Sequence, residues 1–329
     1  YERLDWNENG DTNILVRNGV SENMYNGYRG SINAYYDLNL FNSFNTSLNF
    51  NGRTKPYTKT DTSYYTIFNQ DTEISRDSVF KTDRTLNLEW TTDYTKKFVN
   101  HDNRELTIAF QIGGDINDGD TDIDDGRIWL NKNDEKVIEE TFQIDYTHPF
   151  GKTNNKGESN NRTMPSNKHR GGKNIHKGSN SYSGNQIEFG AKIINRDREI
   201  IYSDMLDNIY IMSEEFKYKQ MVSASYISSE FNLPLGIGFK TGVRYENTKT
   251  EGTWKNNSVD QFSKNYNNLL PSLVLSKSFS PMRSVKFSYN QRITRPSVRQ
   301  INTNSNRTDN MNISIGNPDL EPTKTEQYE

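Results

Sequence analysis

The feature that most constrains the fold of this chain is a two-residue alternation of apolar and polar side chains. It is clearest in residues 235–246, where odd positions are apolar or aromatic apart from Thr241 and even positions are glycine or charged. Side chains on a β-strand alternate between its two faces, so this segment has one apolar face and one polar face. A soluble sandwich would bury the apolar face, whereas a membrane barrel turns it toward lipid and keeps a polar interior.

The same alternation recurs about ten times, over about 8 to 12 residues each, which is the length of a tilted strand that crosses a bilayer. The apolar faces lie near residues 28–36, 44–50, 86–94, 106–112, 142–146, 187–193, 216–226, 235–245, 269–275 and 285–293. A chain that is 31% hydrophobic is too polar for membrane helices, and 12% aromatic residues are too many for a disordered chain. The pattern predicts an all-β fold, a transmembrane antiparallel β-barrel to which this chain contributes about 10–12 strands.

The connections between these segments alternate in length. Short links lie near residues 39–42, 99–103, 232–234 and 280–282, and long polar links lie near 56–78, 113–133, 195–214, 247–264 and 297–323. Outer-membrane barrels have short periplasmic turns and long extracellular loops, while a soluble sandwich has no reason to separate its loops in this way. The alternation therefore favours the membrane barrel.

One connection departs from this rule. Residues 151–184 are rich in Asn, Gly and Ser and carry seven Lys or Arg residues against Glu158 alone. We expect a flexible basic insertion in a periplasmic turn, and a tether for an anionic partner is the alternative. The chain opens at Tyr1 without a signal peptide. We therefore interpret residues 1–329 as a fragment of a single outer-membrane β-barrel domain.

The sharpest chemical cluster is acidic. Residues 115–126 hold six carboxylates, and calcium prefers oxygen ligands of this kind. Asp118, Asp120 and Asp122 are the candidate calcium ligands, although Ile123 stands where an EF-hand loop starting at Asp118 needs glycine. The alternative is a solvated extracellular loop without an ion. The sequence suggests no other cofactor.

Other functional classes have little support. The four histidines show no zinc-protease spacing, and there is no nucleophile elbow or phosphate-binding glycine loop, so we expect no enzyme. A net charge of −3 gives no sign of a nucleic-acid partner. The charged side chains at Lys240, Arg244 and Glu246 alternate with apolar ones and are typical of a solvated barrel interior.

The last third resembles a known family. The sequences YNNLLPSL at 266–273, FSYNQRITRP at 287–296 and GNPDLEP at 316–322 are similar to strands and a loop-to-strand signature of TonB-dependent outer-membrane receptors of the Bacteroidetes type. Thr323 stands where an acidic residue is usual. The motif residues are Arg295, Pro296, Gly316, Asn317, Pro318 and Pro322. We interpret them as structural, because proline is excluded from central strands and fits a loop that enters one.

This resemblance implies a barrel of roughly 22 strands around an N-terminal plug, in the outer membrane of a Gram-negative bacterium. It implies import of a scarce nutrient driven by the TonB complex through the plug. The plug domain and the C-terminal strands are expected outside this chain. The expected partners are outer-membrane lipid, the TonB complex, an unidentified nutrient ligand and, as a further candidate, a surface lipoprotein. The alternative function is a surface-exposed all-β binding protein or adhesin without transport.

Overall fold

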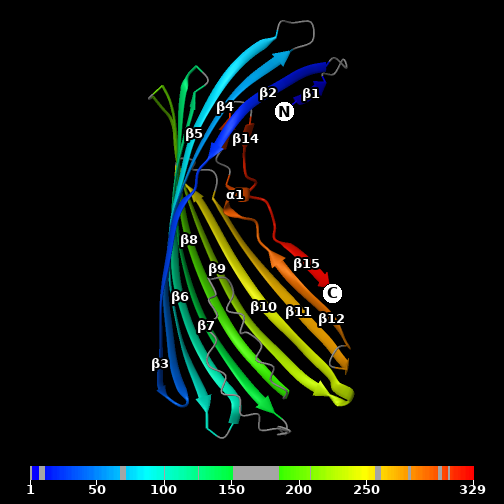
Figure 1. The fold of residues 1–329 in the computed structure, drawn as a ribbon. Helices are drawn as coiled ribbons and strands as arrows, with labels where there is room; N and C mark the ends of the chain where they lie inside the picture. The colour runs from blue at the N-terminus through cyan, green and yellow to red at the C-terminus, as the bar shows by residue number, and fades with distance from the viewer. Residues whose placement is uncertain are drawn as a thin grey trace.

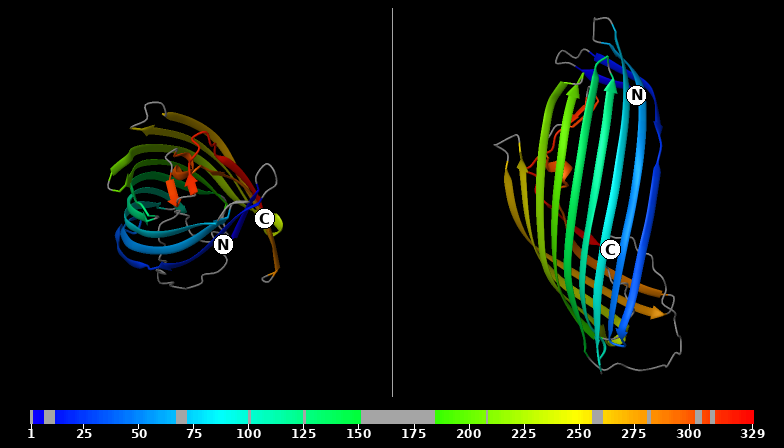
Figure 2. Two further views of the ribbon diagram at one scale, coloured as in Figure 1. Left: turned by 90° about the horizontal axis from the view of Figure 1, so that it is seen from above. Right: turned by 90° about the vertical axis from the view of Figure 1, so that its left-hand side faces the viewer.

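Most of the chain lies in one curved antiparallel β-sheet (Figure 1). The computed structural model describes residues 2–6, 12–66, 72–99, 101–124, 126–150, 185–207, 209–255, 261–280, 283–302, 306–309 and 312–329. Within these ranges the sheet has 13 strands and runs in the order β1-β2-β4-β5-β6-β7-β8-β9-β10-β11-β12-β15, with β3 also on β4. It curls through part of a barrel, as seen from above in Figure 2. The predicted all-β antiparallel fold is confirmed.

The strands are long, and most strands that follow one another in the chain pair as antiparallel hairpins. Their bounds are β1 Glu2–Trp6, β2 Thr12–Asn23, β3 Asn26–Asn39, β4 Asn42–Thr66, β5 Glu73–Phe98, β6 His101–Asp124, β7 Ile128–Phe150, β8 Asn185–Leu206, β9 Ile209–Leu233, β10 Ile237–Trp254, β11 Phe262–Ser280, β12 Arg283–Thr294 and β15 Thr323–Tyr328. Outside the sheet lie the 3₁₀ turn η1 Pro234–Gly236, helix α1 Val298–Ile301 and the hairpin β13 Asn306–Asp309 with β14 Asn312–Ser314. In the described ranges, no helix is long and apolar enough to span a membrane.

β2 and β3 behave as one strand that is interrupted by a proline on its neighbour. Asn23 pairs with Tyr57 and Asn26 pairs with Thr54, so the register on β4 is the same on both sides of the break. Between them the Met24 amide donates to the Pro56 carbonyl at 3.0 Å. Pro56 has no N–H to return the second bond of this pair, so the ladder is interrupted here without a change of register.

The two faces of the sheet differ as the alternation predicts. Phe44, Tyr94, Ile108 and Ile144 stand side by side on β4 to β7 and lie on the outer, convex face. On the inner face Asn87 bridges the same strands, since it accepts from Asn51 at 3.0 Å and donates to Asp115 at 2.6 Å. An apolar outside and a hydrogen-bonded polar inside are the arrangement of a transmembrane barrel wall.

Aromatic side chains gather on the outer face near the ends with short turns. The rings of Phe150 and Phe231 are 5.5 Å apart, and those of Phe231 and Phe239 are 6.1 Å apart. Nearby, the Arg104 guanidinium lies 4.8 Å from the ring of Phe98. Rings with cations beside them suit the boundary between hydrocarbon and headgroups, so this row has the composition of an interfacial aromatic girdle.

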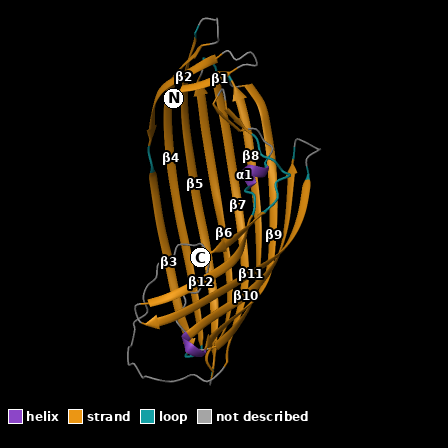
Figure 3. Cartoon of the chain, turned by 90° about the vertical axis from the view of Figure 1, so that its right-hand side faces the viewer, coloured by secondary structure: helices purple, strands orange, loops and turns teal. Residues whose placement is uncertain are grey.

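The short links occur where the sequence predicts them, but most of the expected long loops are wrong. The strands on either side continue, and the connections shrink to residues 67–72, 125–127, 207–208 and 255–261. Figure 3 shows these strands continuing nearly the full height of the sheet. Backbone hydrogen bonds hold a hairpin together in water without apolar side chains, so the apolar alternation marks the lipid-spanning part only and ends before the strand does.

Two further expectations concern the end of the sheet that carries the short turns. Residues 151–184 lie outside the described residues, and their role stays a prediction. Phe150 and Asn185, which flank them, pair with each other at the strand ends where the short turns lie. The strand expected from Leu235 begins at Ile237, because Leu235 and Gly236, both with φ of 69°, form the turn from β9 to β10.

The outward face of β10 provides a test of the membrane assignment. Phe239 lies two residues from the start of β10, and Val243 is further into the strand. Val243→Arg should destabilise the protein by about 2–4 kcal/mol and Phe239→Arg by about 0–1 kcal/mol, because the penalty depends on depth. Lys240→Gln on the inner face is the control. The measurement is the unfolding free energy of each variant in lipid vesicles. Equal losses of this free energy in all three variants would contradict a lipid-facing surface.

Candidate functional site

The long connection from β12 to β15, residues 295–322, folds onto the inner face of the sheet. We call it the inward segment. It contains α1 and the β13–β14 hairpin, and Figure 2 shows both inside the curve of the sheet. Of the long connections predicted in the described parts of the chain, this one remains, and it carries the family motifs.

An apolar cluster attaches α1 to the wall. Val298 and Ile301 are each 5% exposed and pack against Phe216, Tyr218 and Trp254. The rings of Phe216 and Trp254 are stacked with centroids 4.6 Å apart. These aromatic residues point into the lumen and form an apolar patch on the inner face, and the short helix covers it.

Hydrogen bonds define both ends of this helix. At its start Ser297 and Gln300 form a capping box, which satisfies amide groups that a helix of one turn leaves unpaired. At its end the Asn302 amide donates to the Val298 carbonyl at 2.8 Å. The Trp254 indole then donates to the Asn302 side chain at 3.1 Å, so β10 holds the residue that follows the helix.

An ion pair attaches the beginning of the segment. Arg295 donates to the carboxylate of Glu246 and to the Thr248 hydroxyl, the latter at 2.9 Å. Arg244 donates to the same carboxylate at 2.9 and 3.0 Å. Glu246 is only 5% exposed, and a carboxylate so buried needs charged partners. Arg295 thus joins the segment to β10 where β10 carries a buried charge.

The GNPDLEP motif closes the segment on itself. The Gly316 amide donates to the Asn302 carbonyl at 2.9 Å, and the Asn317 amide donates to the Gln300 carbonyl at 2.6 Å. A Cβ atom at position 316 would lie 2.3 Å from the Asn302 carbonyl oxygen, so only glycine permits this approach. The Asn317 side chain accepts from the Asp319 amide at 2.9 Å and begins the turn that leads into β15.

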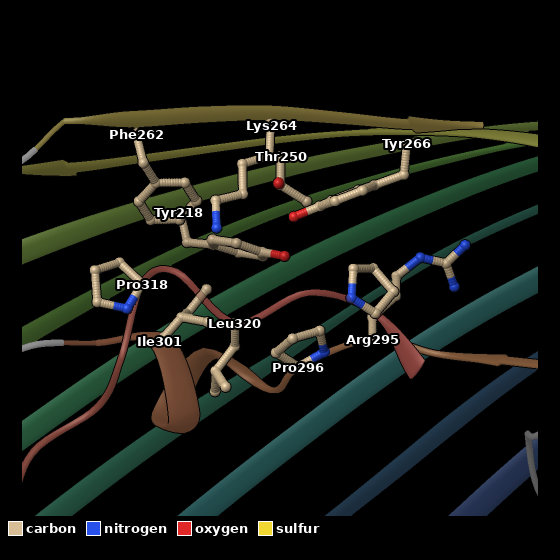
Figure 4. Close-up of a pocket in the computed structure, with 11 residues that line it drawn as sticks. Tyr218, Thr250, Phe262, Lys264, Tyr266, Arg295, Pro296, Ile301, Pro318 and Leu320 are labelled. Carbon is tan, nitrogen blue, oxygen red and sulfur yellow. The ribbon is translucent and has the colours of Figure 1, made fainter. Parts of the chain in front are cut away.

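The structure brings the predicted motif residues together around a small cavity. Arg295, Pro296, Pro318 and Pro322 line it, while Gly316 and Asn317 form the backbone contacts beneath it. The other lining residues are Tyr218, Thr250, Phe262, Lys264, Tyr266, Ile301 and Leu320 (Figure 4). The motif therefore forms one side of a cavity whose other side is the barrel wall.

The apolar face of β9 points the other way from the prediction. Residues 216–226 were expected to turn their apolar side to lipid like the other segments, but Phe216, Tyr218 and Tyr226 face the lumen. Tyr226 reaches across β8 to the carboxylate of Asp145 on β7, and Gly190 on β8 leaves the space for its ring. The physical reason is that these side chains pack on the inward segment and on lumen groups, partners that periodicity alone does not reveal.

Paired charges line the rest of the described inner wall around β7 and β8. Arg198 pairs with Glu135 at 2.8 Å, and Arg196 pairs with Glu139 and also donates to Gln220 at 2.9 Å. Glu246 as the partner of Arg295, and the aromatic cluster under α1, are the parts of this site that the sequence did not single out. A lone charge, and aromatic residues on two different strands, β9 and β10, have no spacing signal for such contacts.

The acidic segment is a strand, and the expected loop at residues 115–126 is wrong. β6 continues to Asp124 because β5 and β7 pair with it throughout. Asp118 and Asp120 project to the outer face beyond the apolar band and both accept from Arg84, at 3.0 and 2.9 Å. A guanidinium opposite alternate carboxylates compensates their repulsion across the strands.

Asp122, the third candidate ligand, has no arginine partner among the described residues, and burial together with the charge of Asp120 raises the pKa of its carboxyl. Burial and a hydrogen bond with Asp118 also raise the pKa of Asp134 on β7. Within the described residues, no group of three or more His, Asp or Glu side chains is arranged to hold a metal ion. The calcium hypothesis stays a prediction.

That prediction can be tested by titration. A site with a Kd near about 1 mM adds only about 1.4 kcal/mol to the unfolding free energy at about 10 mM calcium. Arg84→Gln should increase this gain, because it removes the cation that now lies between Asp118 and Asp120. Thermal unfolding at several calcium concentrations measures both values. A gain several times larger at micromolar calcium would show that a strong site exists.

The attachment of the inward segment can be tested at Arg295. Arg295→Gln leaves Glu246 with one of its two cations and should lower the unfolding free energy by about 3 kcal/mol. Arg292→Gln, at an exposed arginine of β12 three residues earlier, is the matched control and should change it by less than about 0.5 kcal/mol. Urea unfolding in lipid vesicles gives both values. Equal small effects would mean that the ion pair does not hold the segment.

Comparison with known proteins places this geometry in a family. No protein with a curated description matches the chain. Among solved structures, the alcaligin outer membrane receptor FauA of Bordetella pertussis is 12% identical with a TM-score of 0.49, over 95% of this chain and 47% of that one. The siderophore receptor PiuA of Acinetobacter baumannii is 9% identical with a TM-score of 0.47, over 85% and 49%.

This chain spans about half the length of those structures. A family model described as the outer membrane protein beta-barrel family matches residues 96–329, well over half of the chain and the whole of the inward segment. The localisation expected from the alternation, the outer membrane of a Gram-negative bacterium, agrees with this match. The chain belongs to the outer membrane protein beta-barrel family.

Proposed function

We propose that residues 1–329 form part of the barrel of a TonB-dependent receptor that imports a scarce nutrient across the outer membrane. The observation that carries this proposal is the inward segment. It occupies the lumen side of the wall and is attached there by the Arg295–Glu246 ion pair and by the buried contacts of Val298 and Ile301. A wall that folds its own chain into the lumen suits a receptor with a filled interior better than an open pore.

The electrostatics of the inner face support the same role. Its charges are largely paired within the wall, as in Arg198–Glu135 and Arg196–Glu139. A wide barrel with this polar lining would conduct water and ions freely if it were empty. The proposal therefore includes a plug and TonB as partners, in line with the motifs at 287–296 and 316–322. It assigns binding and transport, and no catalysis, to the chain.

The strands that continue past the apolar band give the ligand a place to be captured. β4 to β7 extend as paired hairpins beyond the outer apolar band, and the acidic residues of β6 lie on this extension. We propose that the ligand is captured on these hairpins and then passes along the polar inner face.

The experiment compares three strains of the native host: wild type, a deletion of the gene for this protein, and a deletion of TonB. Each is grown in a defined medium, and the loss of every component from the medium is followed by mass spectrometry. We expect one scarce component whose uptake fails in both deletion strains, while its binding to whole cells persists without TonB. Uptake at the full rate without TonB would contradict the mechanism, and loss of surface attachment as the sole defect would identify an adhesin.

A further inference from the structure

The cavity between the inward segment and the wall has two chemically different sides. β10 and β11 supply Thr250, Lys264 and Tyr266 on one side, and the inward segment supplies Ile301, Leu320 and Pro318 on the other. Figure 4 shows the polar ends of Thr250, Lys264 and Tyr266 directed toward the apolar side chains. The cavity therefore presents hydrogen-bond donors opposite an apolar floor.

The donors are not used by the protein itself. Among the residues that the structure describes, neither the Lys264 ammonium nor the Tyr266 hydroxyl has a hydrogen-bond or ion-pair partner. The Tyr218 hydroxyl accepts from Gln220 at 2.7 Å, which leaves its own hydrogen free to donate. Thr250 and Lys264 are directly opposite each other in the ladder, so their polar ends converge. An ammonium and hydroxyl hydrogens that point into one space suit a single anionic acceptor.

The charge around the cavity also favours an anion. Arg295 and Arg244 share one carboxylate, that of Glu246, and Lys264 adds a further positive charge. The exposed Glu321 places a negative charge near Tyr266.

We propose that this cavity binds the carboxylate group of a small molecule that carries an apolar body. The carboxylate accepts from Lys264 and from the hydroxyls of Tyr266 and Thr250, and the apolar body lies on Ile301, Pro318 and Leu320. The site is distinct from the capture of the transported nutrient and holds whether or not the protein is an importer. Because the floor of the site is the inward segment, a bound molecule also links that segment to the wall.

The test uses the full-length protein purified in detergent, with benzoate as the probe. Benzyl alcohol has the same ring without the charge and is the matched ligand control. Saturation-transfer NMR titrations should show saturable benzoate binding with a Kd in the millimolar range and at least about tenfold weaker binding of benzyl alcohol, since hydrogen bonds to a charged group are the stronger ones.

Three variants locate the binding. Lys264→Gln should weaken benzoate binding about tenfold or more, and Tyr266→Phe should weaken it about fivefold. Glu321→Gln should tighten it by a factor of about two, because it removes a nearby negative charge. Lys286→Gln is the matched control, a lysine on the same face at the far end of the neighbouring strand β12, and should leave the Kd unchanged.

Three outcomes would contradict the proposed site, and one control excludes a folding defect. Thermal unfolding midpoints equal to wild type show that a weaker Kd is not a folding defect. Equal binding of benzyl alcohol and benzoate, or an equal effect of Lys264→Gln and Lys286→Gln, would overturn the proposal. So would the absence of saturable benzoate binding up to about 20 mM in the wild-type protein.

Discussion

The backbone hydrogen-bond ladder is the constraint on which the rest of this structure depends. In hydrocarbon no water can satisfy an unpaired N–H or C=O, so a wall that crosses the outer membrane must pair strand to strand without interruption. From β2 to β12 each strand pairs with its neighbours, and the interruption at Met24 and Pro56, where a donor is missing, does not change the register. The ladder needs no particular side chains, so the paired strands also continue beyond the membrane into water. There the outer face carries Arg84 and its two aspartate partners in place of apolar side chains.

The fixed register then decides what the two faces can do. Outward-facing side chains contact lipid. Inward-facing side chains form amide hydrogen bonds and ion pairs across neighbouring strands. This division does not hold where Phe216, Tyr218 and Trp254 turn large rings into the lumen and α1 of the inward segment covers them. A buried ion pair next to this patch fixes the direction in which the chain leaves β12. The cavity exists because a polar strand surface and the proline-rich segment cannot fill the space between them completely.

Much of the wall could be predicted from residues in sequence. Alternation located nine of the ten lipid-facing surfaces, and the short turns near residues 39–42 and 280–282 are where they were expected. The failures share one cause. Polar stretches such as 113–124 looked like loops because apolar periodicity was taken as the mark of a strand, although a neighbouring strand can hold any sequence that its cross-strand partners tolerate. For β9 the periodicity was correct but its direction was wrong, because alternation states that two faces differ and does not state which one meets lipid.

The sequence by itself determined the class of fold, the membrane, the family motifs and the residues that carry them, because these depend on local spacing and composition. Only the tertiary structure decided that Arg295 meets Glu246, that Gly316 lies against Asn302, and that Lys264 faces Ile301 across a cavity. These pairs are separated by between 14 and 49 residues in the chain. Their meeting depends on the curvature of the sheet and on the return of the chain into the lumen, and neither leaves a period in the sequence.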